Sequence, residues 1–75
     1  MSERLPLASG RTVARAFVRL GWRIARQAGS HIILVKPGSI ATLSVPDHKE
    51  LARGTLRALI QRSGETLEAL VEHLN

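Results

Sequence analysis

Residues 22–45 read WRIARQAGSHIILVKPGSIATLSV. Three segments of this stretch, residues 22–27, 31–36 and 40–45, either alternate apolar with polar side chains or are rich in residues that favour β-strands. Two turn sequences, Ala28-Gly29-Ser30 and Pro37-Gly38-Ser39, separate the three segments. Turns this short join neighbouring antiparallel strands. The stretch therefore predicts a three-stranded antiparallel sheet, with residues 22–27 as a half-buried strand.

The segments on either side of this predicted sheet have the apolar spacing of helices. Residues 10–20 form the first predicted helix, and Gly21 is suited to ending it. Residues 55–62 and 66–74 form two more, with Thr66 as the N-cap of the last. The order of elements is α-β-β-β-α-α. We expect an α+β fold in which the helices pack on one face of the sheet.

A chain of 75 residues is long enough for one domain with a modest core. We expect a single domain over residues 1–75, in which residues 1–9 are a flexible lead-in. The predicted core consists of apolar side chains from the first two helices and the central strand: Phe17, Ile32, Leu34, Leu56, Leu59 and Ile60.

Successive side chains of a strand point to opposite faces of the sheet. If Ile32 and Leu34 face the helices, then His31, Ile33 and Val35 lie on the face that no helix covers. Two apolar side chains on an open face are unusual in bare solvent and indicate a functional surface or a partner that covers it.

The charge of the chain is unevenly distributed. Residues 1–62 hold all eleven Lys and Arg and only three acids, which gives +8, whereas residues 63–75 carry −3. Nine of the eleven basic residues are Arg, which binds phosphate in a bidentate manner. This pattern favours a nucleic acid or an acidic protein as the partner.

Other features of the composition exclude several classes of protein. The chain has no cysteine, so neither a disulfide nor a thiolate metal site holds it together. No apolar run approaches the roughly 20 residues of a membrane helix. The polar start of the chain does not resemble a signal peptide. We therefore expect a cytoplasmic protein that does not enter the membrane.

The chain has three histidines and no recurring spacing of metal ligands. It also lacks a glycine-rich phosphate loop. We therefore predict acid-base chemistry without a metal or other cofactor. His31 is the best candidate for it, because a histidine exchanges protons near neutral pH. Gly29 and Ser30 form the turn that supports His31, and His48 is a candidate for a secondary role.

RNA suits such chemistry because its 2′-OH is a built-in nucleophile for the adjacent phosphorus. One histidine would act as acid or base, and Arg or Lys would stabilise the charge on the phosphoryl oxygens. The basic residues that we predict to contact phosphate are Arg23, Arg26, Lys36 and Lys49.

Four pieces of the sequence, in order, resemble the HicA family of bacterial toxin mRNA interferases. They are Gly21-Trp22, the RQAGSH sequence of residues 26–31, the VPDH sequence of residues 45–48 and the GTLRALI sequence of residues 54–60. The resemblance implies a fold similar to a double-stranded-RNA-binding domain, cleavage of mRNA, and inhibition by a cognate HicB-like antitoxin. It assigns the catalytic histidine to His31.

The sequence departs from the family pattern in two places. Many members have Lys where this chain has Ala28, and many have an aromatic or polar residue soon after the histidine, where this chain has Ile32-Ile33-Leu34. These departures concern catalytic strength and base preference rather than the fold. If an acidic antitoxin covers the open face, it masks His31.

Two other functions fit the basic composition. The chain could be a small RNA-binding module without catalysis, or a basic adaptor for an acidic protein with no role in RNA binding. A cleavage assay separates the first from the toxin hypothesis. The salt dependence of binding separates the second, since phosphate contacts weaken steeply with salt.

Overall fold

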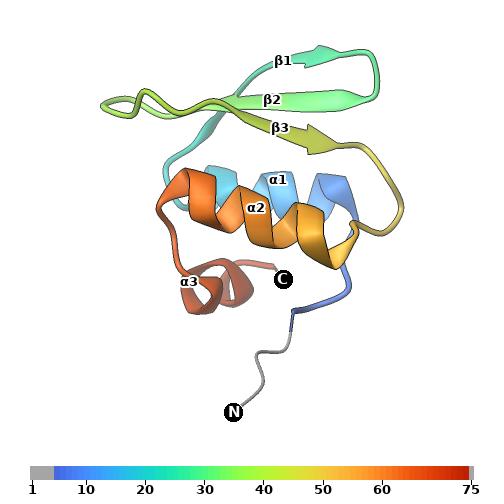
Figure 1. Ribbon diagram of the computed structural model, residues 1–75. Coiled ribbons are helices and arrows are strands. Elements are labelled where there is room, and N and C mark those ends of the chain that lie inside the picture. Colours follow the sequence, from blue (N-terminus) through green and yellow to red (C-terminus); the bar gives the residue numbers. More distant parts are fainter. Residues whose placement is uncertain (1–4, 75) are drawn as a thin grey trace.

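The computed structural model describes residues 5–74 and has the element order α-β-β-β-α-α. The elements are α1 (Gly10–Arg19), β1 (Arg23–Ala28), β2 (His31–Val35), β3 (Leu43–Pro46), α2 (Arg53–Ser63) and α3 (Leu67–Glu72). The three strands form one antiparallel sheet in the order β1-β2-β3. The sheet lies above α1 and α2, and α3 packs beneath them at the end of the chain (Figure 1). The predicted α+β class is confirmed, and the arrangement is of the double-stranded-RNA-binding-domain type.

Local sequence sets where the helices begin and end. The Ser9 hydroxyl caps α1 by accepting a hydrogen bond from the Thr12 backbone N–H at 3.1 Å. Gly21, with φ of +102°, follows the end of α1 in a conformation that favours glycine. The Thr66 side chain caps α3, as predicted, by accepting from the Ala69 backbone N–H at 3.1 Å.

The core lies between the sheet and the helices. Ile32 and Leu34 of β2 are buried there, whereas His31 is exposed, so the predicted facing of the central strand is confirmed. The buried apolar side chains form one cluster: Val13, Ala14, Ala16, Phe17, Trp22, Ile32, Leu34, Leu43, Val45, Leu51, Leu56, Leu59 and Leu70. Ile60 is only half-buried, at the edge of this cluster. Adjacent helical residues point about 100° apart, so Ile60 lies to one side of the buried Leu59.

The first strand differs from its prediction. It begins at Arg23, because Trp22 turns into the core, and all six of its residues are exposed rather than half-buried. β1 is an edge strand at one side of the sheet, so Ile24 remains 50% exposed although it shares a face with the buried Leu34. A shift in register between Ile24 and Arg26 interrupts its pairing with β2.

The third strand also differs from its prediction, since it begins at Leu43 rather than at residue 40. The turn at Pro37 and Gly38 forms as expected, with the Ser39 N–H donating to the Lys36 carbonyl at 3.0 Å. The Ser39 hydroxyl then accepts from the Ala41 N–H at 3.1 Å and holds the next residues in a loop. Ile40 is consequently fully exposed in this loop.

The segment before α1 is packed against the domain. Of the predicted lead-in, residues 1–4 lie outside the described residues, and residues 5–9 have no regular secondary structure. Leu5 and Ala8 nevertheless pack against the core, and the Ala8 carbonyl accepts a hydrogen bond from the Leu51 N–H at 2.9 Å. Residues 5–9 are thus part of the folded unit.

Candidate active site on the open face of the sheet

The turn between β1 and β2 places His31 at the start of its strand. Ala28 and His31 are paired across the hairpin, so only Gly29 and Ser30 form the loop. Gly29 has φ of +60°, and Ser30 does not have a positive φ. A two-residue hairpin loop with glycine in this first position is characteristic of a type II′ turn. The Gly-Ser-His sequence thus makes a tight turn that fixes the backbone before the histidine.

The open face of the sheet carries basic and apolar side chains. The pairing of the strands puts eight residues on this face: Arg23, Arg26, Ala28, His31, Ile33, Val35, Ser44 and Pro46. None of the three strands contains an acidic residue. The face is therefore positively charged, with half-buried Ile33 and Val35 on its central strand.

His31 and the two arginines of this face have no side-chain hydrogen bond or ion pair within residues 5–74. Arg26 is the nearer arginine to His31 in the register, because it pairs with Ile33, two residues along β2. Arg23 pairs with Val35 at the far end of the strand. The open face thus carries one exposed histidine and two guanidinium groups without a side-chain partner within residues 5–74, and Arg26 is the one closer to the histidine.

Lys36 lies away from this group. Its ammonium is 3.0 Å from Glu65 Oε2 and 5.9 Å from the centre of the Trp22 ring. The Trp22 indole N–H also donates to Glu65 Oε2, at 3.2 Å. Lys36 therefore connects the end of β2 to the segment between α2 and α3, and its role as a phosphate contact stays a prediction.

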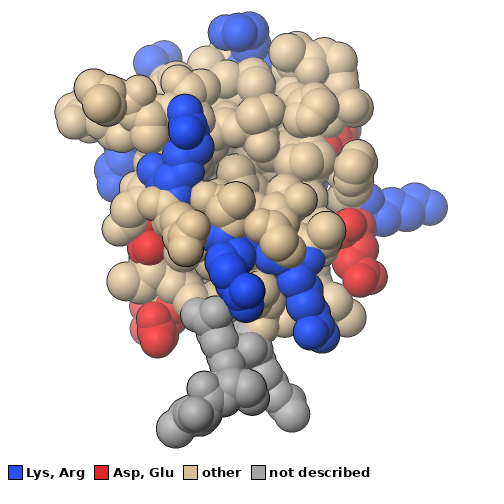
Figure 2. Space-filling model, viewed as in Figure 1, with Lys and Arg blue, Asp and Glu red and all other residues tan. Residues whose placement is uncertain are grey.

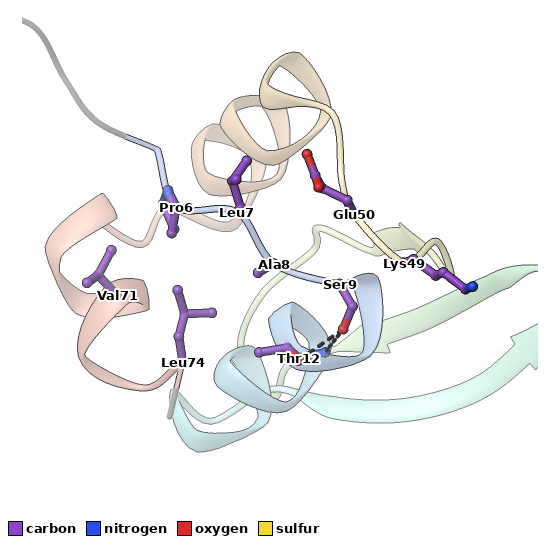
Figure 3. A pocket seen from close by; sticks show the side chains of 9 residues that line it. All are labelled: Pro6, Leu7, Ala8, Ser9, Thr12, Lys49, Glu50, Val71 and Leu74. Carbon is purple, nitrogen blue, oxygen red and sulfur yellow. Dashed lines mark hydrogen bonds between the residues drawn. The ribbon is translucent and has the colours of Figure 1, made fainter.

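Lys49 is exposed in the loop after β3. It lines a groove together with Glu50, the segment before α1, and Val71 of α3 (Figure 3). This groove lies among the helical elements rather than on the open face of the sheet. A contact between Lys49 and phosphate also stays a prediction.

His48 lies at the same end of the sheet as His31. It follows Pro46, which pairs with His31, by two residues. Its backbone carbonyl accepts a hydrogen bond from the Gly10 N–H at 2.9 Å, and the residue is exposed. The loop that carries His48 is thereby attached to the first turn of α1.

Asp47, between Pro46 and His48, was not among the residues singled out from the sequence. Arg11 donates to its carboxylate from Nε, 3.2 Å from Oδ1, and Gln27 donates from Nε2, 3.3 Å from Oδ2. The Arg11 hydrogen bond is the main reason that the pKa of Asp47 lies below its usual value of 3.8. The partners are 36 and 20 residues away in sequence, so no local signal could have revealed them.

The surface charge extends beyond the sheet. Basic side chains project at the top of the molecule, over the sheet, and across the front, over α2 (Figure 2). Within residues 5–74 no three side chains of His, Cys, Asp and Glu come together to hold a metal ion. In the same part of the chain, every helix is too short or too polar to cross a membrane.

Comparison with known proteins identifies the family. A model of the family described as the HicA toxin of bacterial toxin-antitoxin matches residues 10–65, from the first residue of α1 to the segment after α2. A search of curated proteins found no match. The family match includes all three strands and the turn before His31, and it covers most of the chain. The chain therefore belongs to the HicA family of toxins from bacterial toxin-antitoxin systems.

Proposed function

We propose that this toxin is an endoribonuclease that cleaves mRNA, with His31 as general acid or base. The observation that carries the proposal is the exposed His31, whose side chain has no hydrogen-bond partner within residues 5–74. It lies on a face that holds Arg23 and Arg26 and to which the strands contribute no acidic residue. A polyanion is attracted to such a face. A histidine at its end is accessible to the sugar-phosphate backbone.

The reaction uses the RNA itself as the nucleophile. The 2′-oxygen loses its proton and bonds to the adjacent phosphorus, while the bond from phosphorus to the 5′-oxygen breaks and that oxygen gains a proton. His31 handles one of these two proton transfers. Arg26, as the nearer arginine, stabilises the negative charge on the phosphoryl oxygens. The products are a 2′,3′-cyclic phosphate and a 5′-hydroxyl.

Incubation of the purified toxin with RNA should give fragments that end in a 2′,3′-cyclic phosphate. Mass spectrometry of the fragments identifies this end, because it weighs one water less than an open phosphate. EDTA should not change the rate, since the proposed reaction uses no metal ion. Loss of cleavage on addition of EDTA would contradict the mechanism. RNA binding without cleavage would favour the non-catalytic RNA-binding module.

The partner that silences this toxin is an acidic, HicB-like antitoxin that covers the open face and masks His31. Ile33 and Val35 are half-buried on the central strand of that face, and the two arginines pair with them from β1. Protein interfaces commonly bury an apolar centre inside a polar rim. Acidic side chains on the partner would pair with the arginines and accelerate capture.

Replacing Arg23 and Arg26 together by Gln should weaken both RNA binding and antitoxin binding. If each arginine contacts one phosphate, the slope of log K against log salt should fall by about 1.4 for single-stranded RNA. Fluorescence anisotropy at several salt concentrations measures both affinities.

The matched control replaces Arg15 and Arg53 by Gln. These arginines are exposed on α1 and α2, and their replacement removes the same net charge. It should alter the slope less than the double substitution on the sheet. Equal slopes for the two double variants would show that binding depends on net charge rather than on the open face. An unchanged antitoxin affinity in the sheet variant would mean that the partner binds another surface.

A further inference from the structure

The Asp47 carboxylate joins three elements at one point. It accepts from Arg11 of α1, with Nε 3.2 Å from Oδ1 and Nη2 3.3 Å from Oδ2, and from Gln27 of β1, with Nε2 3.3 Å from Oδ2. Asp47 itself directly follows β3. The Asp47 side chain is 19% exposed and that of Arg11 is 66% exposed, so this cluster lies at the surface of the protein.

The same residue holds the turn that precedes His31. The Asp47 N–H donates to the Ser30 carbonyl at 2.7 Å. Gln27 Nε2 donates to the Asp47 carboxylate and also to the Gly29 carbonyl, at 3.4 Å. Both residues of the loop between β1 and β2 are therefore bonded to Asp47, directly or through Gln27. His31 is the next residue along the chain.

The carboxylate lies on the opposite side of the sheet from the His31 side chain. Gln27 pairs with Ile32, which is buried against the helices, and Arg11 belongs to α1. An RNA molecule on the open face would not reach the carboxylate. Asp47 is bonded to the turn before His31, so we expect its effect on cleavage to pass through the backbone of the turn.

We infer that Asp47, through Arg11 and Gln27, is a positioning residue that holds the Gly29-Ser30 turn and thereby fixes where His31 meets the RNA. The inference rests on the proposed function of His31. A carboxylate suits this position because all its side-chain partners are donors. In an asparagine, one oxygen becomes an NH₂ group, which is itself a donor and would face Arg11 or Gln27.

Cleavage by Asp47→Asn tests the inference. We expect kcat to fall about 10-fold, because a small displacement of a catalytic group is costly. KM for RNA should stay within about twofold, since the carboxylate does not touch the RNA. Hydrogen exchange of the His31 amide and of the Asp47 amide, which donates to the Ser30 carbonyl at 2.7 Å, should become faster in the variant. This readout reports the loosened turn without reference to activity.

Thr66→Ala is the control for general destabilisation. It removes the N-cap of α3, which lies on the far side of the helices from the sheet (Figure 1). It should lower the melting temperature but leave kcat and the exchange of the His31 amide unchanged.

Gln27→Met is a second test variant. It keeps the ion pair between Arg11 and Asp47 and should lower kcat about 3-fold, because it also loosens the turn before His31.

The outcomes separate this inference from the proposed function. The positioning role is overturned if Asp47→Asn and Gln27→Met retain the kcat of the native chain, including the case in which only their KM for RNA rises. If the toxin does not cleave RNA, or His31→Ala cleaves as fast as the native chain, the proposed function fails. Faster exchange at His31 and Asp47 would then support only the structural part of the inference.

Discussion

Replacing His31 by alanine should lower the rate of RNA cleavage about 100-fold or more, the typical cost of losing a general acid or base. The melting temperature should stay within about 3 °C of the native value, because substitutions of exposed residues seldom change stability by more than about 0.5 kcal/mol. His31 is exposed, and its side chain makes no hydrogen bond within residues 5–74. Initial cleavage rates and thermal unfolding of the two proteins measure the two effects.

His48→Ala is the matched control for this prediction. His48 is also exposed and lies at the same end of the sheet, but it extends from a loop rather than from the open face. We expect its substitution to affect cleavage less than that of His31. A His31→Ala protein that retained full toxicity in cells would show that another group moves the proton.

The central strand explains why most of the fold could be predicted from sequence. A short apolar run between two glycine turns favours a strand, and Ile32 and Leu34 lie in the core as the alternation along that strand predicts. The edge strands were predicted less well. The alternation at Trp22 and Ile24 indicated a half-buried strand, but burial of an edge strand depends on how far the helices reach across the sheet. That distance is a tertiary property with no local signal.

Part of the candidate site was predictable for the same reason. Alternation along β2 put His31 on the open face, and an arginine-rich strand beside it supplied the basic neighbours. The contacts of Lys36 and Asp47 were not predictable. Each is an ion pair between residues 29 or more positions apart, Lys36 with Glu65 and Asp47 with Arg11. Such pairs form only once the fold has brought the chain segments together.

Gly10→Ala should destabilise the protein by about 3 kcal/mol, at the upper end of the usual cost of overpacking. Gly10 is buried in the first turn of α1, and its N–H donates to the His48 carbonyl at 2.9 Å. A Cβ at this position would overlap the Pro46 carbonyl oxygen and lie 3.2 Å from Asp47 Cα. Both are backbone atoms, which cannot rotate aside as a side chain could. The helix or the loop must therefore move.

For a domain of this size, that loss corresponds to a fall of roughly 12–24 °C in melting temperature. Gly54→Ala is the control, because Gly54 lies in the first turn of α2 with no atom within 4 Å of a Cβ placed there. Alanine favours the helix by about 1 kcal/mol relative to glycine, so this variant should melt at the native temperature or above it. Circular dichroism of the two variants measures the difference. If Gly10→Ala melted like the native chain, the loop would be free to move away from α1. The turn before His31 is held by two hydrogen bonds, one to the Ser30 carbonyl from the Asp47 N–H and one to the Gly29 carbonyl from Gln27. Movement of the loop that carries Asp47 would break the first of them.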